Sequence, residues 1–155
     1  MQPYAASSFV TVWKLVRAML THVAGITLWS LQYMFDQTQK SSHIRNICKF
    51  ISLKNDAVVR TLSILEFDFC FHLEYNADIK SFTSQPFGFH YQFNNRKCRY
   101  LPDLLVTDHD NHSPFFEVKH SSQILAPDFW EWFKEKQGVT LKEFNRRLVL
   151  VTEKR

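Results

Sequence analysis

The second half of the chain contains a regular alternation of apolar and polar residues. The apolar members of this alternation are Phe87, Phe89, Tyr91 and Phe93. A period of two places alternate side chains on opposite faces, so the pattern predicts a strand over residues 87–93. Turn residues at 94–95 and 108–113 then separate apolar runs, which predicts two further strands over about 97–107 and 115–119.

A second pattern, with helical spacing, precedes these strands. Its apolar members are Leu62, Leu65, Phe69 and Leu73. This stripe predicts a helix over about residues 58–75, ended by the turn residues at 76–78. The remaining predicted elements are helices over 127–137 and 141–147, interrupted at Gly138, and a short buried strand over 148–151. The order of helix, three-strand meander, helix and strand predicts an α/β fold, in which helices flank a mixed sheet.

The first 42 residues differ from the rest and are expected to form an N-terminal hydrophobic extension, separate from a domain over 43–155. Residues 18–35 carry no formal charge, which approaches the length of a membrane span. A signal or anchor segment, an extra docked helix, and an extension outside the working domain are three interpretations that stay open. Polar residues within the stretch speak against the first. Helical spacing of Trp13, Val16, Leu20 and Val23 favours the second.

Length and composition narrow the class of protein. The chain has 155 residues, 45% of them hydrophobic, which fits one globular domain and excludes a wholly disordered chain. The formal net charge of +4 permits a polyanionic partner without requiring one. Three widely spaced cysteines predict neither a disulfide framework nor a zinc ribbon, and they favour a reducing, intracellular compartment.

Three carboxylates occupy positions that folding alone would not select. Glu66 falls within the apolar stripe of the first helix, and Asp103 follows Pro102 in an apolar strand. A buried carboxylate is paired, protonated or bound to a metal. For Glu66 alone, the favoured interpretation is the ordinary one, in which a glutamate at the edge of the stripe extends its carboxylate to solvent or pairs with Arg60 or a later lysine.

The third carboxylate, Glu117, shares a strand face with Lys119, because residues two apart point the same way. One turn separates this strand from the strand of Asp103, so we expect the two strands to be antiparallel neighbours. Asp103 and Glu117 would then lie close together, and a cation between them would offset their repulsion. Oxygen ligands favour Mg²⁺ or Mn²⁺, and Lys119 could orient an attacking water.

The order of a helical Glu, a Pro-Asp and a Glu-x-Lys resembles the PD-(D/E)xK nuclease superfamily, whose core is helix, three strands, helix and strand. Between about residues 45 and 155 the chain is more closely similar to the TnsA endonuclease of TnsABC-type transposons. The matching segments are Lys49-Phe50-Ile51-Ser52-Leu53-Lys54-Asn55, Leu62-Ser63-Ile64-Leu65-Glu66-Phe67-Asp68-Phe69, Ser84-Gln85-Pro86, Arg99-Tyr100-Leu101-Pro102-Asp103-Leu104-Leu105-Val106 and Phe116-Glu117-Val118-Lys119.

This resemblance implies a restriction-endonuclease-like core and a metal-dependent DNA endonuclease. Its catalytic set would be Glu66, Asp103, Glu117 and Lys119. The metal, Mg²⁺ with Mn²⁺ as a substitute, would be held by Glu66, Asp103, Glu117 and the Val118 carbonyl. The substrate would be the 5′ ends of a transposon. A TnsB-like DDE transposase and a TnsC-like ATPase would be partners in a bacterial cytoplasm, at the nucleoid when active. A membrane partner is not expected.

Other residues have weaker claims to a role. Gln85 lies in the family's Gln-Pro element and has a structural or DNA-contacting role in this interpretation. Basic or histidine side chains that could contact DNA are Arg96, Lys97, Arg99 and His120. The acidic and histidine residues between 108 and 112 could hold a metal, but a solvated turn is the favoured interpretation.

Two alternative functions are weighed against the transposase subunit. The first is a non-catalytic module for transposase assembly or DNA binding. It is favoured because the sequence ends at Arg155, before the winged-helix-like domain usual in the family, and it is opposed by the intact catalytic set. The second is a stand-alone restriction or repair nuclease of the same superfamily.

Overall fold

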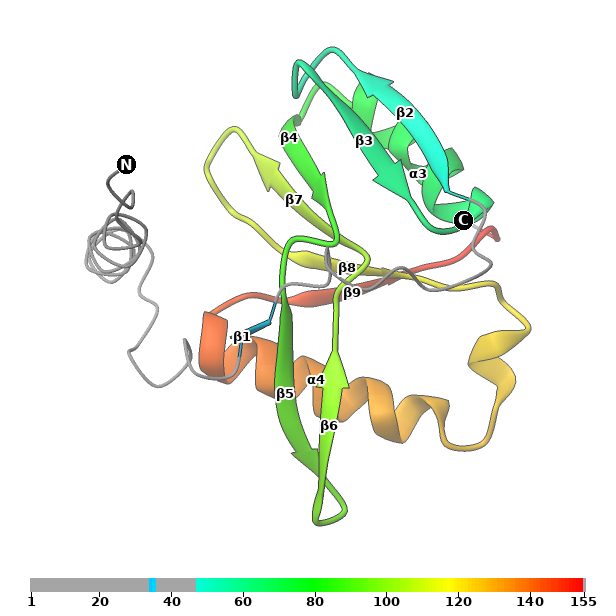
Figure 1. The fold of residues 1–155 in the computed structure, drawn as a ribbon, viewed down its shortest axis with the longest axis vertical. Helices are drawn as coiled ribbons and strands as arrows, with labels where there is room; N and C mark the ends of the chain where they lie inside the picture. Colours follow the sequence, from blue (N-terminus) through cyan, green and yellow to red (C-terminus); the bar gives the residue numbers. More distant parts are fainter. Residues whose placement is uncertain (1–33, 36–46, 155) are drawn as a thin grey trace, which may run out of the picture.

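The computed structural model describes residues 34–35 and 47–154 (Figure 1). Its elements in chain order are β1 (Met34–Phe35), β2 (Cys48–Ser52), β3 (Ala57–Thr61), α3 (Ile64–Tyr75), β4 (Ile79–Ser84), β5 (Gly88–Phe93), β6 (Arg96–Tyr100), β7 (Leu104–Asp108), β8 (Phe115–Val118), the 3₁₀ helix η1 (Gln123–Leu125), α4 (Phe129–Phe144) and β9 (Leu148–Val151). The expected mixed α/β class is confirmed.

The central sheet has four strands in the order β4-β7-β8-β9. The pairs β4–β7 and β7–β8 are antiparallel, whereas β8–β9 is parallel, so the sheet is mixed as expected. A parallel pair needs a crossover, and α4 supplies it between β8 and β9. The core of helix, three-strand meander, helix and strand therefore consists of α3, β4-β7-β8, α4 and β9.

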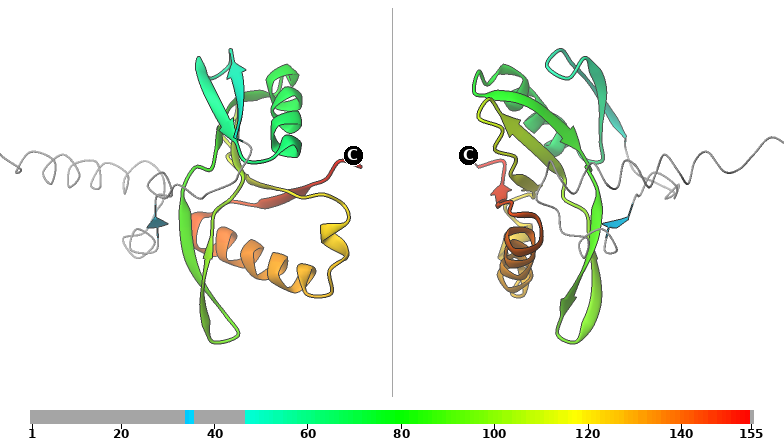
Figure 2. Two further views of the ribbon diagram at one scale, coloured as in Figure 1. Left: turned by 45° about the vertical axis from the view of Figure 1, so that its right-hand side comes forward. Right: turned by 90° about the vertical axis from the view of Figure 1, so that its left-hand side faces the viewer.

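The two helices cover opposite faces of this sheet (Figures 1 and 2). One hydrophobic cluster joins α3 and the β2–β3 hairpin to the sheet through Leu104, Val106 and Val118. The other joins α4 and the β5–β6 hairpin to the sheet through Phe115 and Leu148. Burying both faces is the ordinary solution for a sheet crossed by an αβ connection.

The first strand of the meander differs from the one predicted. The structure uses β4, which the sequence patterns did not predict, and places the predicted strand 87–93 in a separate hairpin of β5 and β6 with β1. The predicted strand over 97–107 is divided into β6 and β7 at residues 101–103. Pro102 has no N–H to donate to a sheet ladder, which explains the division at this point.

The first helix begins later than predicted, at Ile64 instead of residue 58. Residues 57–61 form β3, which pairs with β2 in an unpredicted hairpin, because Val58, Val59 and Thr61 are β-branched. Ser63 is the N-cap of the helix, and its hydroxyl accepts a hydrogen bond from the Glu66 N–H at 3.1 Å. This N-cap contact fixes where the helix begins.

The C-terminal helix was predicted as two pieces and is one. Helix α4 runs without a break through Gly138 to Phe144, and its C-cap residue Asn145 has a left-handed φ of 51°. The strand predicted over 148–151 is confirmed. The extra N-terminal helix and most of the uncharged stretch 18–35 lie outside the described residues. None of the helices in the described part of the chain is long and apolar enough to span a bilayer.

Gly138 lies in the interior of α4, is exposed, and has no atom within 4 Å of the position of an added Cβ. We therefore expect Gly138→Ala to raise the free energy of unfolding by about 1 kcal/mol, because alanine loses less backbone entropy in a helix. Urea denaturation followed by circular dichroism measures this change. The exposed Lys134 is the matched control, and Lys134→Gly should lower stability by a similar amount. A loss of stability in Gly138→Ala would contradict a continuous helix.

Candidate active site

Asp103 is fixed by its backbone at the entry to the central sheet. Its N–H donates to the Phe116 carbonyl of β8 at 3.1 Å, and its carbonyl accepts from the Gln85 N–H at the end of β4 at 2.8 Å. Gln85 has a φ of 49°, a conformation that turns the chain out of β4 directly after this bond. The backbone of Asp103 is thus held between β4 and β8, which fixes the position from which its side chain projects.

Glu117 and Lys119 project from one face of β8, as the strand alternation predicted. The register pairs Leu104 with Phe116 in antiparallel strands, so Asp103 lies beside Glu117. Phe116 and Val118 point to the opposite face and pack in the cluster below α3. Lys119 follows the end of β8, and its N–H donates to the Val151 carbonyl of β9 at 3.0 Å.

The Lys119 ammonium lies among oxygens from three different groups. Its Nζ is 3.2 Å from Asp103 Oδ2, 3.2 Å from Glu117 Oε1 and 3.2 Å from the Val118 carbonyl. Asp103 Oδ2 also accepts from the Val118 N–H at 2.8 Å. The two carboxylates and the carbonyl that the resemblance implied as metal ligands therefore surround one cationic atom.

Two residues that sequence reasoning did not assign to the site also contact Glu117. The Tyr100 hydroxyl at the end of β6 donates to Glu117 Oε2, and Lys136 Nζ of α4 lies 3.3 Å from Oε1. Lys136 also lies 4.4 Å from the centre of the Tyr100 ring. Tyr100 stood within a segment that carried the family resemblance. Lys136 is three residues after buried Phe133 and four before buried Thr140, a helical spacing that would have indicated an inward lysine.

Burial and charge shift the pKa values of this group in ways expected for a closed cluster. Burial, together with the nearby Glu117 carboxylate, raises the pKa of Asp103 to about 6. Burial opposes the charge of Lys119, but Asp103 and Glu117 outweigh it and raise the lysine's pKa. Burial and Glu117 hold the pKa of Tyr100 well above its usual value, so the hydroxyl keeps its proton and remains a donor.

Glu66 is buried as predicted, but its carboxylate is engaged locally. It accepts from the Leu62 N–H at 3.0 Å and from the Ser63 hydroxyl at 2.9 Å, so both of its oxygens bind groups at the N-terminus of α3. These local hydrogen bonds account for its burial, and the described residues show no ion pair between Glu66 and Arg60. Within the described part of the chain, Glu66 makes no hydrogen bond or ion pair with Asp103, Glu117 or Lys119. Its charge nevertheless adds to the raised pKa of Asp103.

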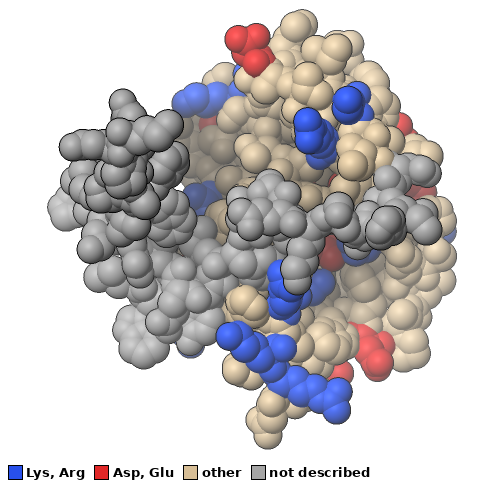
Figure 3. All heavy atoms as spheres, viewed as in Figure 1, with Lys and Arg blue, Asp and Glu red and all other residues tan. Residues whose placement is uncertain are grey.

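The predicted DNA-contacting residues lie outside this cluster. Arg96, Lys97 and Arg99 are exposed along β6, and Figure 3 shows Lys and Arg side chains gathered at the lower end of the view, where the β5–β6 hairpin lies in Figure 1. His120 is exposed beside Lys119, with Nδ1 2.9 Å from Ser122 Oγ and Nε2 3.5 Å from Glu153 Oε1.

The turn between β7 and β8 holds a second group of acidic and histidine side chains. Ligand atoms of Asp108, Asp110 and His112 lie within 4.8 Å of one another, close enough to hold an ion. The group is also explained as a turn, because Asp108 accepts from the His112 N–H at 2.8 Å and lies 3.0 Å from its Nδ1. Both oxygens of the Asp108 carboxylate therefore contact His112 within the turn between β7 and β8, as expected for a turn residue.

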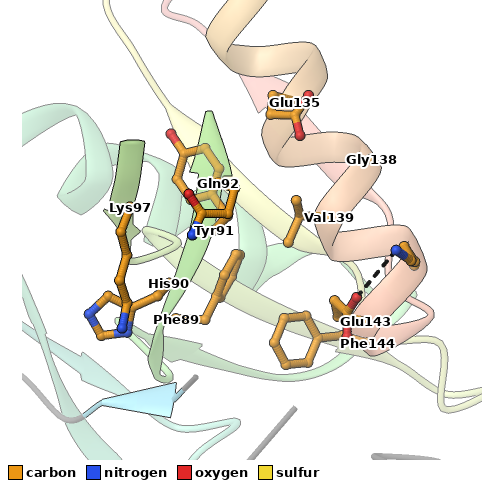
Figure 4. Close-up of a pocket in the computed structure, with 11 residues that line it drawn as sticks. Phe89, His90, Tyr91, Gln92, Lys97, Glu135, Gly138, Val139, Glu143 and Phe144 are labelled. Carbon is orange, nitrogen blue, oxygen red and sulfur yellow. Dashed lines mark ion pairs between the residues drawn. The ribbon is translucent and has the colours of Figure 1, made fainter. Parts of the chain in front are cut away.

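A cavity of about 660 Å³ lies between β5 and α4. Figure 4 shows Phe89, Tyr91 and Phe144 beside it, with Glu135 and Val139 on the helix side. None of the four predicted catalytic residues lines this cavity. The cavity is therefore separate from the carboxylate cluster, and we assign it no role in the chemistry.

Comparison with known families shows which family the chain belongs to. The model of the TnsA-like endonuclease N-terminal domain matches residues 76–153, which run from the end of α3 to just beyond β9. The chain belongs to this TnsA-like endonuclease family. Its fold is consistent with a restriction-endonuclease-like core, and family membership supports a nuclease function in transposition, with DNA as substrate. No curated protein matches the chain.

The matched region of the TnsA-like domain includes Asp103, Glu117 and Lys119, whereas Glu66 precedes it. The family is typically metal-dependent, and the donor chemistry here fits a hard divalent cation. Two carboxylates and a carbonyl already surround one positive atom, and Asp103 Oδ1 accepts no hydrogen bond from the described residues. The site thus offers oxygen ligands of the kind that Mg²⁺ and Mn²⁺ prefer.

The raised pKa of Asp103 has a consequence for stability in the presence of a chelator. The pKa of Asp103 is about 6 in the folded protein and about 3.8 ordinarily, so between these pH values the folded protein keeps a proton on Asp103 that the unfolded chain has released. This stabilisation is present below about pH 4 and is lost as the pH rises to about 6. Asp103→Asn removes the buried charge, so it should raise the free energy of unfolding above pH 6 by on the order of 2 kcal/mol and by little near pH 4.

Urea denaturation at several pH values measures this difference. The exposed Asp110 provides the control, since Asp110→Asn should show no comparable rise. Equal stability of wild type and Asp103→Asn at every pH would contradict the raised pKa.

Proposed function

We propose that this TnsA-like domain is the Mg²⁺-dependent endonuclease subunit of a heteromeric transposase, and that it hydrolyses phosphodiesters at the 5′ ends of a transposon. The observation that carries the proposal is the convergence of Asp103, Glu117 and the Val118 carbonyl on the Lys119 ammonium, each within 3.2 Å. Two carboxylates and a backbone carbonyl that converge on one point are the set of oxygen ligands that hard divalent cations take, which supports a metal site here.

Each residue has a role that follows from its position. Asp103 and Glu117, with the Val118 carbonyl, would hold Mg²⁺ or its substitute Mn²⁺, and Glu66 would serve a second ion. The bound metal supplies Lewis-acid stabilisation of the negative charge that develops on the phosphate. Lys119 keeps its proton, because the carboxylates raise its pKa, so it acts as a donor that orients the attacking water or stabilises phosphate charge. The products are a 5′-phosphate and a 3′-hydroxyl.

The wider setting of the reaction rests on the family alone. We propose a TnsB-like DDE transposase as the enzyme that cuts the opposite strand, and a TnsC-like ATPase as a regulator. The location would be the bacterial cytoplasm, at the nucleoid during transposition. The exposed basic residues of β6 would contact the phosphate backbone, because Lys and Arg on a projecting hairpin neutralise phosphates without reading sequence.

Cleavage tests the catalytic assignment. In Mg²⁺, with the partner proteins present, Asp103→Ala and Lys119→Ala should each reduce nicking of transposon-end DNA by about 10²-fold or more, since each removes a group needed at the phosphate. Asp110→Ala, in the exposed turn, is the matched carboxylate control and should cleave normally. Circular dichroism establishes that the variants are folded.

Full cleavage by Asp103→Ala would reject the assignment. If neither wild type nor the variants contributed any cleavage to the mixture, a non-catalytic assembly module would explain the chain better. Cleavage by the wild type without any partner would instead favour a stand-alone nuclease of the same superfamily.

Binding at several salt concentrations tests the basic hairpin. Lys97→Ala should weaken binding to duplex DNA whatever its sequence, and it should reduce the slope of log affinity against log salt by about one, as expected for one lost phosphate contact. The control is Lys80→Ala, near the start of β4, where the lysine donates to Asn111 in the turn between β7 and β8. An unchanged slope in Lys97→Ala would exclude this residue from the DNA interface.

A further inference from the structure

Lys136 occupies an unusual place for a lysine on a surface helix. It lies on the buried side of α4, between Phe133 and Thr140, and its side chain is only 19% exposed. The next lysine along the helix, Lys142, has a side chain that is 82% exposed. A lysine is rarely held this deeply unless a partner offsets the loss of hydration. The fold therefore directs one particular ammonium of α4 towards the site.

The partner of Lys136 is Glu117, and the contact involves the oxygen that faces Lys119. Lys136 Nζ lies 3.3 Å from Glu117 Oε1, while Lys119 Nζ lies 3.2 Å from the same atom. The other oxygen, Oε2, accepts from the Tyr100 hydroxyl. The Tyr100 ring lies 4.4 Å below the Lys136 ammonium and so supports its position as well. Both oxygens of Glu117 are occupied by donors from this chain.

The charges of the cluster balance without a metal. Asp103 and Glu117 contribute two negative charges, and Lys119 and Lys136 contribute two positive charges, so the formal sum is zero. A divalent cation that binds Glu117 Oε1 must share or replace the contact of an ammonium there. It would also feel the repulsion of the second ammonium across a few ångströms in a partly buried site, where charges are weakly screened.

We propose that Lys136 competes with the divalent cation for Glu117 and thereby keeps metal affinity low in the DNA-free protein. The inference rests on the proposed function, because it takes Asp103 and Glu117 as ligands of the metal. Lys119 is assigned to the reaction itself, whereas Lys136 acts through Glu117 and is a positioning residue. The same contact holds Glu117 in place while the metal is absent, since it completes the set of donors around the carboxylate.

Calorimetric titration of Mn²⁺ into the full-length, DNA-free protein tests the competition without any measurement of activity. Lys136→Met should bind Mn²⁺ more tightly than wild type by on the order of tenfold, because one neighbouring positive charge is gone. Lys136→Gln should change affinity in the same direction and provides a second, polar replacement if the methionine variant does not fold. Lys136→Arg keeps the charge and should stay within roughly twofold of wild type.

Two controls locate the effect. Lys134→Met removes an exposed lysine from the same helix, so it should leave Mn²⁺ affinity unchanged. Asp103→Ala should abolish the titrated site in both the wild-type and the Lys136→Met background, which separates it from any ion held by the turn between β7 and β8.

The outcomes distinguish this inference from the proposed function. Mn²⁺ binding that requires Asp103 but is equal or weaker in Lys136→Met and Lys136→Gln would overturn the competition and leave the metal site standing. Absence of any Asp103-dependent Mn²⁺ binding, in every variant, would overturn the metal site and the competition together.

Discussion

The mutual repulsion of Asp103 and Glu117 is the constraint on which the rest of this site depends. The two carboxylates lie side by side because β7 and β8 are paired in a register that places Asp103 next to Glu117. Neither can move away, since each is anchored in the backbone of the central sheet. Two buried negative charges at this separation must be offset, and the fold does so with the ammonium groups of Lys119 and Lys136. Burial, followed by the Glu117 carboxylate, still raises the pKa of Asp103, so the two ammonium groups do not fully offset the cost of the buried charges.

Three elements supply most of the charged groups of the site and hold them in place. The β8 strand supplies Glu117, Val118 and Lys119, and its parallel partner β9 fixes the backbone of Lys119. The α4 crossover between these strands brings Lys136 back over the same face. One strand–helix–strand unit thus carries most of the charged groups, which explains why the donors converge although they are spread along the sequence.

Much of this arrangement follows from local sequence patterns, and the exceptions have physical reasons. The pairing of Asp103 with Glu117 could be predicted because a single turn joins their strands. The β2–β3 hairpin and β4 could not, because they are short and carry charged or polar residues such as Lys49, Arg60 and Ser81 among the apolar ones. Lys136 was missed because the predicted break at Gly138 ended the apolar stripe before Thr140 and Phe144, which show that the lysine faces inward.

The short break at Pro102 connects the β5–β6 hairpin directly to the central sheet, although the two belong to separate sheets. The β5–β6 hairpin projects past α4 (Figure 2), and its outer positions carry Arg96 and Lys97. The same hairpin ends in Tyr100, whose hydroxyl donates to Glu117, and only Leu101 and Pro102 lie between Tyr100 and Asp103. Strand β6 therefore carries the exposed Arg96 and Lys97 at its outer end and the Tyr100 contact with Glu117 at its inner end. The position of the basic residues is thus tied through one short strand to the support of a carboxylate in the cluster.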